Sequence, residues 1–216
     1  MSPAPRITEL LVAADPGAWH EAGFMVEGDV ARVGTTSLRF AGPDAGRGIV
    51  GWRLSGVETE DWDGLETEPA GDLEVVPGGG EEAGHPNGVR NIDHVVIFTP
   101  ALERTIEAFE VNGVRCRRVR EVGPADAQLR QAFFRFGEVI AEVVQVPEKQ
   151  AGPDGAARFW GLTVVVADLE GLVADLGPER VGTIRDAVQP GRRIATMRRE
   201  AGLGIPVALI TPEPAA

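Results

Sequence analysis

One order of predicted elements recurs along this chain of 216 residues and limits the folds open to it. In the central stretch, residues 92–98 have the composition of a strand. Residues 100–109 follow with a proline in the first turn and apolar residues at helical spacing. Three further apolar-rich runs, separated by turn residues, are predicted strands: 114–122, 131–136 and 138–146. The central unit is therefore strand, helix and three strands, or βαβββ.

The segments on both sides of this unit repeat its order. The first has its predicted elements at 7–13, 17–24, 30–34, 37–41 and 48–54. The last has them at 161–166, 168–176, around Arg185, 193–198 and 205–210. A unit repeated at this length usually buries its sheet face against another copy. We therefore predict an α+β fold, with an N-terminal βαβββ-like module at 1–56 and a domain of two βαβββ modules at 90–216, divided into 90–147 and 158–212.

The stretch between these parts carries most of the chain's negative charge. The chain has 33 acidic and 21 basic residues, which gives a net charge of −12. Ten of the acids lie between residues 54 and 89, where there is no lysine or arginine. Glycines and prolines interrupt this stretch, so we predict a solvated acidic linker at 57–89. The acidic balance also disfavours nucleic acid as a partner, because phosphates need a basic surface.

The rare residues exclude further classes of protein. Cys116 is the single cysteine, which rules out a disulfide framework and favours a reducing compartment. Serine occurs only at positions 2, 37 and 55, so a serine hydrolase has little to be built from. No apolar run is long enough for a membrane span or a signal peptide. We expect a cytoplasmic protein that binds no membrane.

Two stretches of the central unit carry a family resemblance. The opening sequence IDHVVIFTPALERTIEAFEVNG and the closing strand VIAEVVQVP, together with the module order, resemble the vicinal oxygen chelate superfamily. Its members include glyoxalase I, bleomycin-resistance proteins, extradiol dioxygenases and methylmalonyl-CoA epimerase. The resemblance implies glyoxalase-like paired modules whose curled mixed sheets form a half-open barrel around a small-molecule cavity. In catalytic members, side chains of the first and last strands of each module hold a divalent metal there.

Strand alternation places two polar residues on otherwise apolar faces of the central unit. His94 shares a predicted face with Ile92, Val96 and Phe98, and Glu142 shares one with Ile140 and Val144. The resemblance puts metal ligands at these two positions, His94 and Glu142. Imidazole and carboxylate together suit Zn, Ni, Co, Mn or Fe. The alternatives are a structural histidine, a backbone-bonded carboxylate, or a simple His94–Glu142 pair.

A third metal ligand depends on which modules pair. A catalytic metal usually needs at least three protein ligands. Glu9 aligns with His94 if the first and second modules pair. The third module has Gly161 or Leu162 at that position and Ala208 at the position of Glu142, and none of these binds metal. The short connection at 148–157 favours pairing of the second and third modules, and the sequence leaves both arrangements open.

Other residues are candidates for contact with a ligand. Arg192 and Arg193 follow a Gln-Pro-Gly turn and are predicted at the cavity mouth, where a guanidinium can hold a carboxylate. Phe134 and Trp160 are candidates to line an apolar pocket. The arginines at 115, 117, 118 and 120 fall on both faces of one predicted strand and are expected to be solvated. His20 and His85 are expected to face solvent.

The sequence leaves two small-molecule functions open, and a structural or regulatory module is a third possibility. One is a glyoxalase-like enzyme, a metal-assisted lyase or isomerase, with Glu142 or Glu9 moving the proton. The other is a metal-free protein of the bleomycin-resistance type that binds and sequesters a small molecule. An odd number of modules leaves one sheet face without an intrachain mate, which favours a homodimer.

Overall fold

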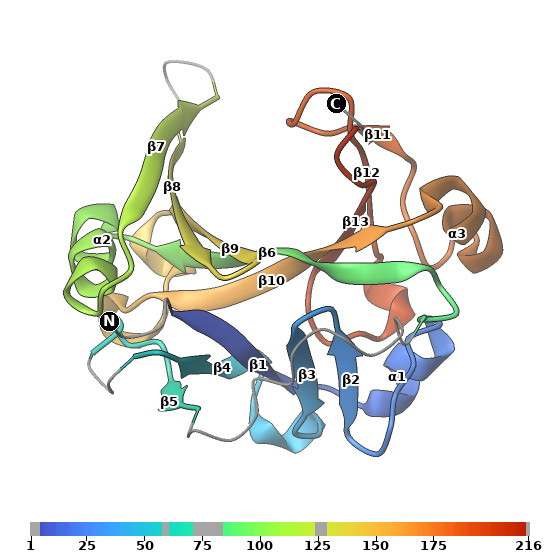
Figure 1. The fold of residues 1–216 in the computed structure, drawn as a ribbon, viewed down its shortest axis with the longest axis horizontal. Helices are drawn as coiled ribbons and strands as arrows, with labels where there is room; N and C mark the ends of the chain where they lie inside the picture. The colour runs from blue at the N-terminus through green and yellow to red at the C-terminus, as the bar shows by residue number, and fades with distance from the viewer. Residues whose placement is uncertain (1–4, 58–60, 71–83, 124–128, 215–216) are drawn as a thin grey trace.

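A computed structural model describes residues 5–57, 61–70, 84–123 and 129–214. Within these ranges, two mixed sheets and three short α-helices make up the fold (Figure 1). The α+β class predicted from the sequence is confirmed. None of the helices in these ranges has the length and apolar character needed to cross a membrane.

The larger sheet has eight strands and contains both modules of the 90–216 region. One half consists of β6 (Val89–Thr99), α2 (Leu102–Val111), β7 (Cys116–Val122), β8 (Leu129–Phe136) and β9 (Val139–Gln145). The other consists of β10 (Arg158–Val166), α3 (Leu169–Leu176), β11 (Arg185–Asp186), β12 (Arg193–Thr196) and β13 (Val207–Ile210). The strand order is β11-β12-β13-β10-β6-β9-β8-β7, with β6 antiparallel to β10 at the centre. Residues 90–147 and 158–212 therefore pair with each other through β6 and β10, which is the arrangement that the short connection at 148–157 favoured.

The smaller sheet contains the first segment in a different arrangement. Its elements are β1 (Arg6–Ala13), α1 (Pro16–Glu21), β2 (Val30–Val33), β3 (Thr36–Phe40), β4 (Gly48–Ser55) and β5 (Thr67–Pro69). The strand order is β2-β3-β1-β4-β5, and β1 is parallel to β3 and antiparallel to β4. In the larger sheet, the first strand of each module is instead parallel to the last strand. The first segment thus has the predicted element order but not the strand pairing of the other two.

The two sheets pack face to face around one apolar core. Trp52 on β4 is fully buried, and its ring lies 5.2 Å from the ring of Phe136 on β8 and 5.1 Å from that of Phe159 on β10, measured between centroids. Figure 1 shows the smaller sheet beneath the larger one, whose outer strands rise on both sides. The apolar sheet face that was predicted to have no intrachain mate is therefore covered within the chain by the other sheet. The homodimer stays a prediction.

Part of the segment expected to be a solvated linker is buried. Trp62 is 1% exposed, and its ring lies 5.2 Å from that of Phe109. Asp63, 7% exposed, accepts a hydrogen bond from Arg104 Nε at 2.6 Å and another from the Thr105 hydroxyl. The expectation of solvation is wrong for these residues, because Trp62 inserts into the aromatic core and α2 neutralises the acid beside it. Residues 58–60 and 71–83 of the segment lie outside the described residues.

Candidate functional site

The two central strands of the larger sheet each contain a β-bulge. In the β6–β10 pairing, His94 is opposite Thr163 and Ile92 is opposite Val164, so Asp93 is an extra residue. Trp160 is the extra residue of β10. A bulge re-aims the side chains beside it. Asp93 and His94 consequently lie on the same side of the sheet, so the predicted shared face of His94 and Ile92 is wrong.

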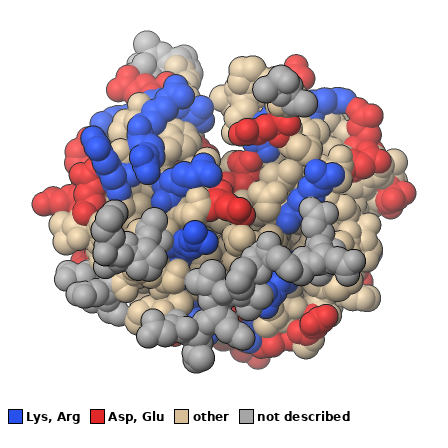
Figure 2. Space-filling view, in the orientation of Figure 1, with Lys and Arg blue, Asp and Glu red and all other residues tan. Residues whose placement is uncertain are grey.

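We call this side the concave face, which is the side of the larger sheet that faces away from the smaller one. It carries a small apolar cluster separate from the main core, formed by Val96, Phe98, Val144 and Val146. Trp160 stacks on Phe98 with ring centroids 5.2 Å apart and is 39% exposed. Figure 2 shows a notch between two lobes, with acidic side chains at its base and one flank and basic side chains on the other lobe. An apolar surface with a few polar groups beside it is typical of a small-molecule site.

His94 is held in one orientation by Asp93. The His94 Nδ1 atom lies 2.7 Å from Asp93 Oδ2, and Arg192 Nη1 lies 2.7 Å from Asp93 Oδ1. Burial raises the pKa of Asp93, but its hydrogen bonds and charge interactions with His94 and Arg192 outweigh burial and hold that pKa below its usual value. The ionised carboxylate can only accept, so Nδ1 carries the proton and Nε2 is presented to the concave face.

Glu142 meets His94 on this face. The His94 Nε2 atom lies 3.5 Å from Glu142 Oε2 and 2.9 Å from the Thr163 hydroxyl. Gln131 donates a hydrogen bond to the other oxygen, Glu142 Oε1, at 2.6 Å. The side chains of His94 and Glu142 are 13% and 14% exposed, so both are largely desolvated and still reachable. A histidine and a carboxylate at this separation can exchange a proton with a bound molecule.

The donor set does not fit the divalent metal that the resemblance implies. Among the residues that the structure describes, no group of three His, Cys, Asp or Glu side chains could hold a metal ion. The strand register places Gly161 and Ala208 at the positions equivalent to His94 and Glu142. A Cβ on Gly161 would lie 2.4 Å from the Pro206 carbonyl oxygen, so that backbone has no room for a ligand side chain. His94 and Glu142 remain, one short of the usual catalytic set.

Glu9, the third predicted ligand or base, lies in the other sheet. It is 7% exposed on β1, and its carboxylate is 3.0 Å from Arg39 Nε and 3.2 Å from Arg53 Nη1. Both arginines belong to the same five-stranded sheet. Glu9 therefore neutralises local charge there and does not join His94 and Glu142.

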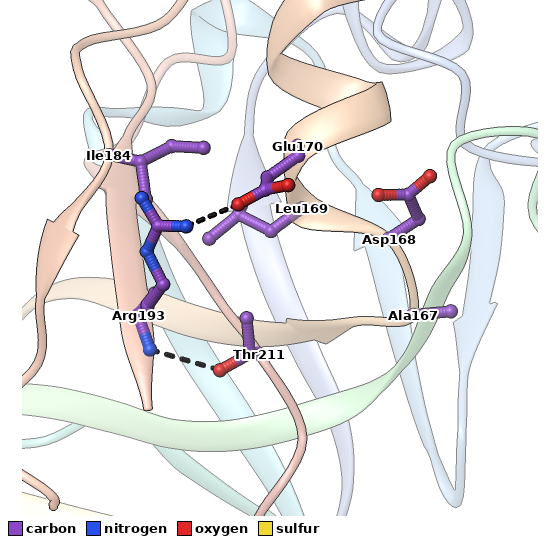
Figure 3. Close-up of a pocket in the computed structure, with 7 residues that line it drawn as sticks. All are labelled: Ala167, Asp168, Leu169, Glu170, Ile184, Arg193 and Thr211. Carbon is purple, nitrogen blue, oxygen red and sulfur yellow. Dashed lines mark hydrogen bonds and ion pairs between the residues drawn. The ribbon is translucent and has the colours of Figure 1, made fainter. Parts of the chain in front are cut away.

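The predicted substrate-binding residues divide between four places. Arg192 is 4% exposed, and besides pairing with Asp93 it donates to the Thr211 carbonyl. It therefore holds Asp93 in place and is itself buried. Arg193 pairs with Glu170 beside a cavity of about 170 Å³ at the start of α3, and neither residue contacts His94 or Glu142 (Figure 3). Phe134 is fully buried, 4.6 Å from Phe109 between ring centroids. Only Trp160 lies exposed on the concave face.

His85 departs from the expectation that it faces solvent. It is 5% exposed, Nδ1 accepts a hydrogen bond from the Met25 amide at 2.9 Å, and Nε2 lies 2.8 Å from the Arg32 carbonyl. Burial is the main cause that lowers the pKa of His85. It is therefore a neutral structural histidine with the proton on Nε2. His20 is exposed, as expected.

Sequence reasoning missed Asp93, Thr163 and Gln131. Asp93 and His94 are adjacent, and regular alternation would place them on opposite faces. Thr163 and Gln131 reach the site only through cross-strand register. The signal for Asp93 in the sequence was an acid directly before a histidine. That signal indicates a shared site only if a bulge places both side chains on one face.

The comparisons with known proteins found matches among solved structures. No protein-family model and no curated protein matches the chain. Methylmalonyl-CoA epimerase from Mycobacterium tuberculosis is 22% identical over 59% of this chain and 91% of that chain, with a TM-score of 0.47. A Streptomyces coelicolor methylmalonyl-CoA epimerase in complex with 2-nitronate-propionyl-CoA is 17% identical over 59% and 97%, with a TM-score of 0.46. A hypothetical protein from Bacillus halodurans is 13% identical over 58% and 96%, with a TM-score of 0.45.

Proposed function

We propose that the concave face binds a small organic molecule and that His94 and Glu142 move a proton at the carbon beside its carbonyl group, an isomerase-type reaction. One observation carries the proposal. His94, oriented by an ionised Asp93, presents Nε2 at 3.5 Å from Glu142 Oε2 next to an apolar cluster. Acid and base groups on a partly desolvated surface are what proton transfer from carbon requires.

Each side chain has a separate task in this proposal. Glu142 takes the proton, because Gln131 occupies Oε1 and leaves Oε2 toward the bound molecule. The proton passes from Glu142 to His94 Nε2, and the resulting imidazolium, whose charge Asp93 balances, donates a hydrogen bond to the developing enediolate-like charge or returns the proton to the carbon. In the resting state the Thr163 hydroxyl donates a hydrogen bond to Nε2. The bound molecule replaces this hydrogen bond. These side chains do the chemistry without a metal.

The alternative is a protein that sequesters its ligand without reaction. Gly161 and Ala208 favour it, because half of the polar positions implied by the resemblance have no polar side chain. Both functions use the concave face, and they differ in whether a proton leaves the ligand.

Hydrogen exchange in D2O separates these functions. We expect the protein to catalyse deuterium uptake, seen by NMR, at the carbon beside the carbonyl of at least one compound from a panel of acyl thioesters, 2-oxo acids and 2-hydroxy carbonyl compounds. His94→Ala and Glu142→Gln should each slow the exchange by about 10²–10⁴-fold. His20→Ala is the matched control, because His20 is exposed on α1.

The same assay tests the role of metal. Exchange that persists in EDTA supports side-chain chemistry. Exchange that is lost in EDTA and restored by Zn, Ni, Co, Mn or Fe(II) would support the metal-assisted form. Ligand-dependent stabilisation without exchange of any bound compound would contradict the enzyme and favour sequestration.

A further inference from the structure

A bulge in β7 turns arginines toward the concave face. In the β7–β8 pairing, Cys116 is opposite Phe134 and Arg118 is opposite Phe133, so Arg117 is the extra residue. Phe133 itself is opposite Glu142 on β9, which belongs to the concave face. Arg118 therefore joins that face, and Arg120, two residues further along, follows it by strand alternation. The expectation that these arginines are merely solvated overlooked this bulge.

Arg120 is held in place by two neighbours on β8. Its Nε donates to Gln131 Oε1 at 2.6 Å, and its guanidinium carbon lies 4.9 Å from the centre of the Phe133 ring. Stacking and one hydrogen bond fix the plane of the guanidinium group. No further hydrogen bond of Arg120 is formed within the described residues, so both terminal nitrogens are left for a ligand.

Three arginines on this part of the concave face have no direct carboxylate partner in the described part of the chain. They are Arg118, Arg120 and Arg135, which we call the arginine wall. Arg135 shares the concave side with Phe133 by alternation on β8. On the opposite side of the same strand, Arg130 pairs with Glu103 of α2. Figure 2 shows basic side chains gathered on one lobe beside the notch.

We propose that the arginine wall binds an anionic oxygen group, a carboxylate or a phosphate, on the molecule that reacts at His94 and Glu142. This substrate class rests on the proposed function. The planar fork of Arg120 suits both anions. Gln131 joins Arg120 to Glu142 by two hydrogen bonds of 2.6 Å, so the anchor of the ligand and the base are positioned by one side chain. The anchor strand β7 and the base strand β9 lie two strand spacings apart, about 10 Å. The anionic group therefore lies several bonds from the reacting carbon.

Titration calorimetry with two small anions tests this proposal. Malonate represents a carboxylate, inorganic phosphate represents a phosphoryl group, and malonamide is the neutral analogue of malonate. We expect saturable binding of malonate or phosphate to the wild-type protein at millimolar concentration, and none of malonamide. The anion that binds more tightly identifies the ligand group, carboxylate or phosphate, that the arginine wall prefers. Arg120→Gln should weaken binding about tenfold.

Two further arginine variants test whether the anion binds at the arginine wall. Arg135→Gln lies at an exposed position and should also weaken binding without affecting the fold. Arg130→Gln removes an arginine from the other side of β8, paired to Glu103, and should leave the affinity unchanged. Equal losses in all three variants, or no saturable binding of either anion to the wild-type protein, would overturn the proposal. His94→Ala should retain malonate or phosphate binding while losing deuterium exchange, so the failure of one proposal is distinguishable from that of the other.

Discussion

Replacing Trp62 with alanine is expected to lower the free energy of unfolding by about 3–5 kcal/mol. The ring is 1% exposed and lies within 6.0 Å of the rings of Trp52, Phe109 and Phe136, measured between centroids. Alanine would leave a cavity where the acidic segment, β4, α2 and β8 meet. Urea unfolding followed by circular dichroism measures the change.

Trp160→Ala is the matched control for this substitution. Trp160 is 39% exposed on the concave face, so its loss should cost far less stability. If residue 62 belonged to a solvated linker, Trp62→Ala would change stability by less than about 0.5 kcal/mol. That outcome would contradict the packing of this segment into the core.

Replacing Asp93 with alanine is expected to cost about 3–5 kcal/mol, because it leaves a buried partner charge without its counter-ion. Arg192 is 4% exposed, and within the described residues its guanidinium would keep only the hydrogen bond to the Thr211 carbonyl. His94 would lose the acceptor of its Nδ1 proton. Deuterium exchange should therefore fall together with stability, whereas Trp62→Ala at a temperature where it remains folded should retain exchange.

A double variant tests whether the unpaired charge of Arg192 causes this loss of stability. Asp93→Ala combined with Arg192→Met should be less destabilising than the sum of the two single changes, because no buried charge remains unpaired. Glu103→Gln is the control, because it breaks an exposed ion pair, the one with Arg130. It should lower the free energy of unfolding by about 1 kcal/mol or less.

The pKa of Asp93 is lowered in the folded state, so its contribution is present above the usual Asp pKa of about 3.9 and is lost as the pH falls through the folded value. Asp93→Asn should remove this acid-dependent loss. A wild-type protein and an Asp93→Asn variant with the same pH dependence would contradict the assignment.

Alternation and the order of elements were enough to predict much of the fold and one part of the site. The helix and strands of the second module follow from apolar spacing, and His94 and Glu142 stand out because each is polar on an apolar face. Regular period-two alternation on β9 placed Glu142 correctly with Val144. These features are local, so the sequence expresses them directly.

The remaining features depend on single-residue irregularities and on contacts distant in sequence. Bulges at Asp93, Trp160 and Arg117 each move a side chain to the other face, and a propensity argument cannot position one extra residue. The burial of Trp62 depends on an aromatic core built by three other segments. Its acidic, proline-rich and glycine-rich surroundings are typical of loops and gave the opposite indication.

The imidazole NMR spectrum tests the location of the site most directly, because the chain has only three histidines. In the free protein, we expect His94 with its proton on Nδ1 and His85 with its proton on Nε2, two distinguishable tautomers. On addition of the compound that exchanges deuterium, or of the better anion if none does, the His94 signals should shift while those of His20 and His85 stay in place. A saturable shift confined to His20 or His85 would contradict a site at His94 and Glu142.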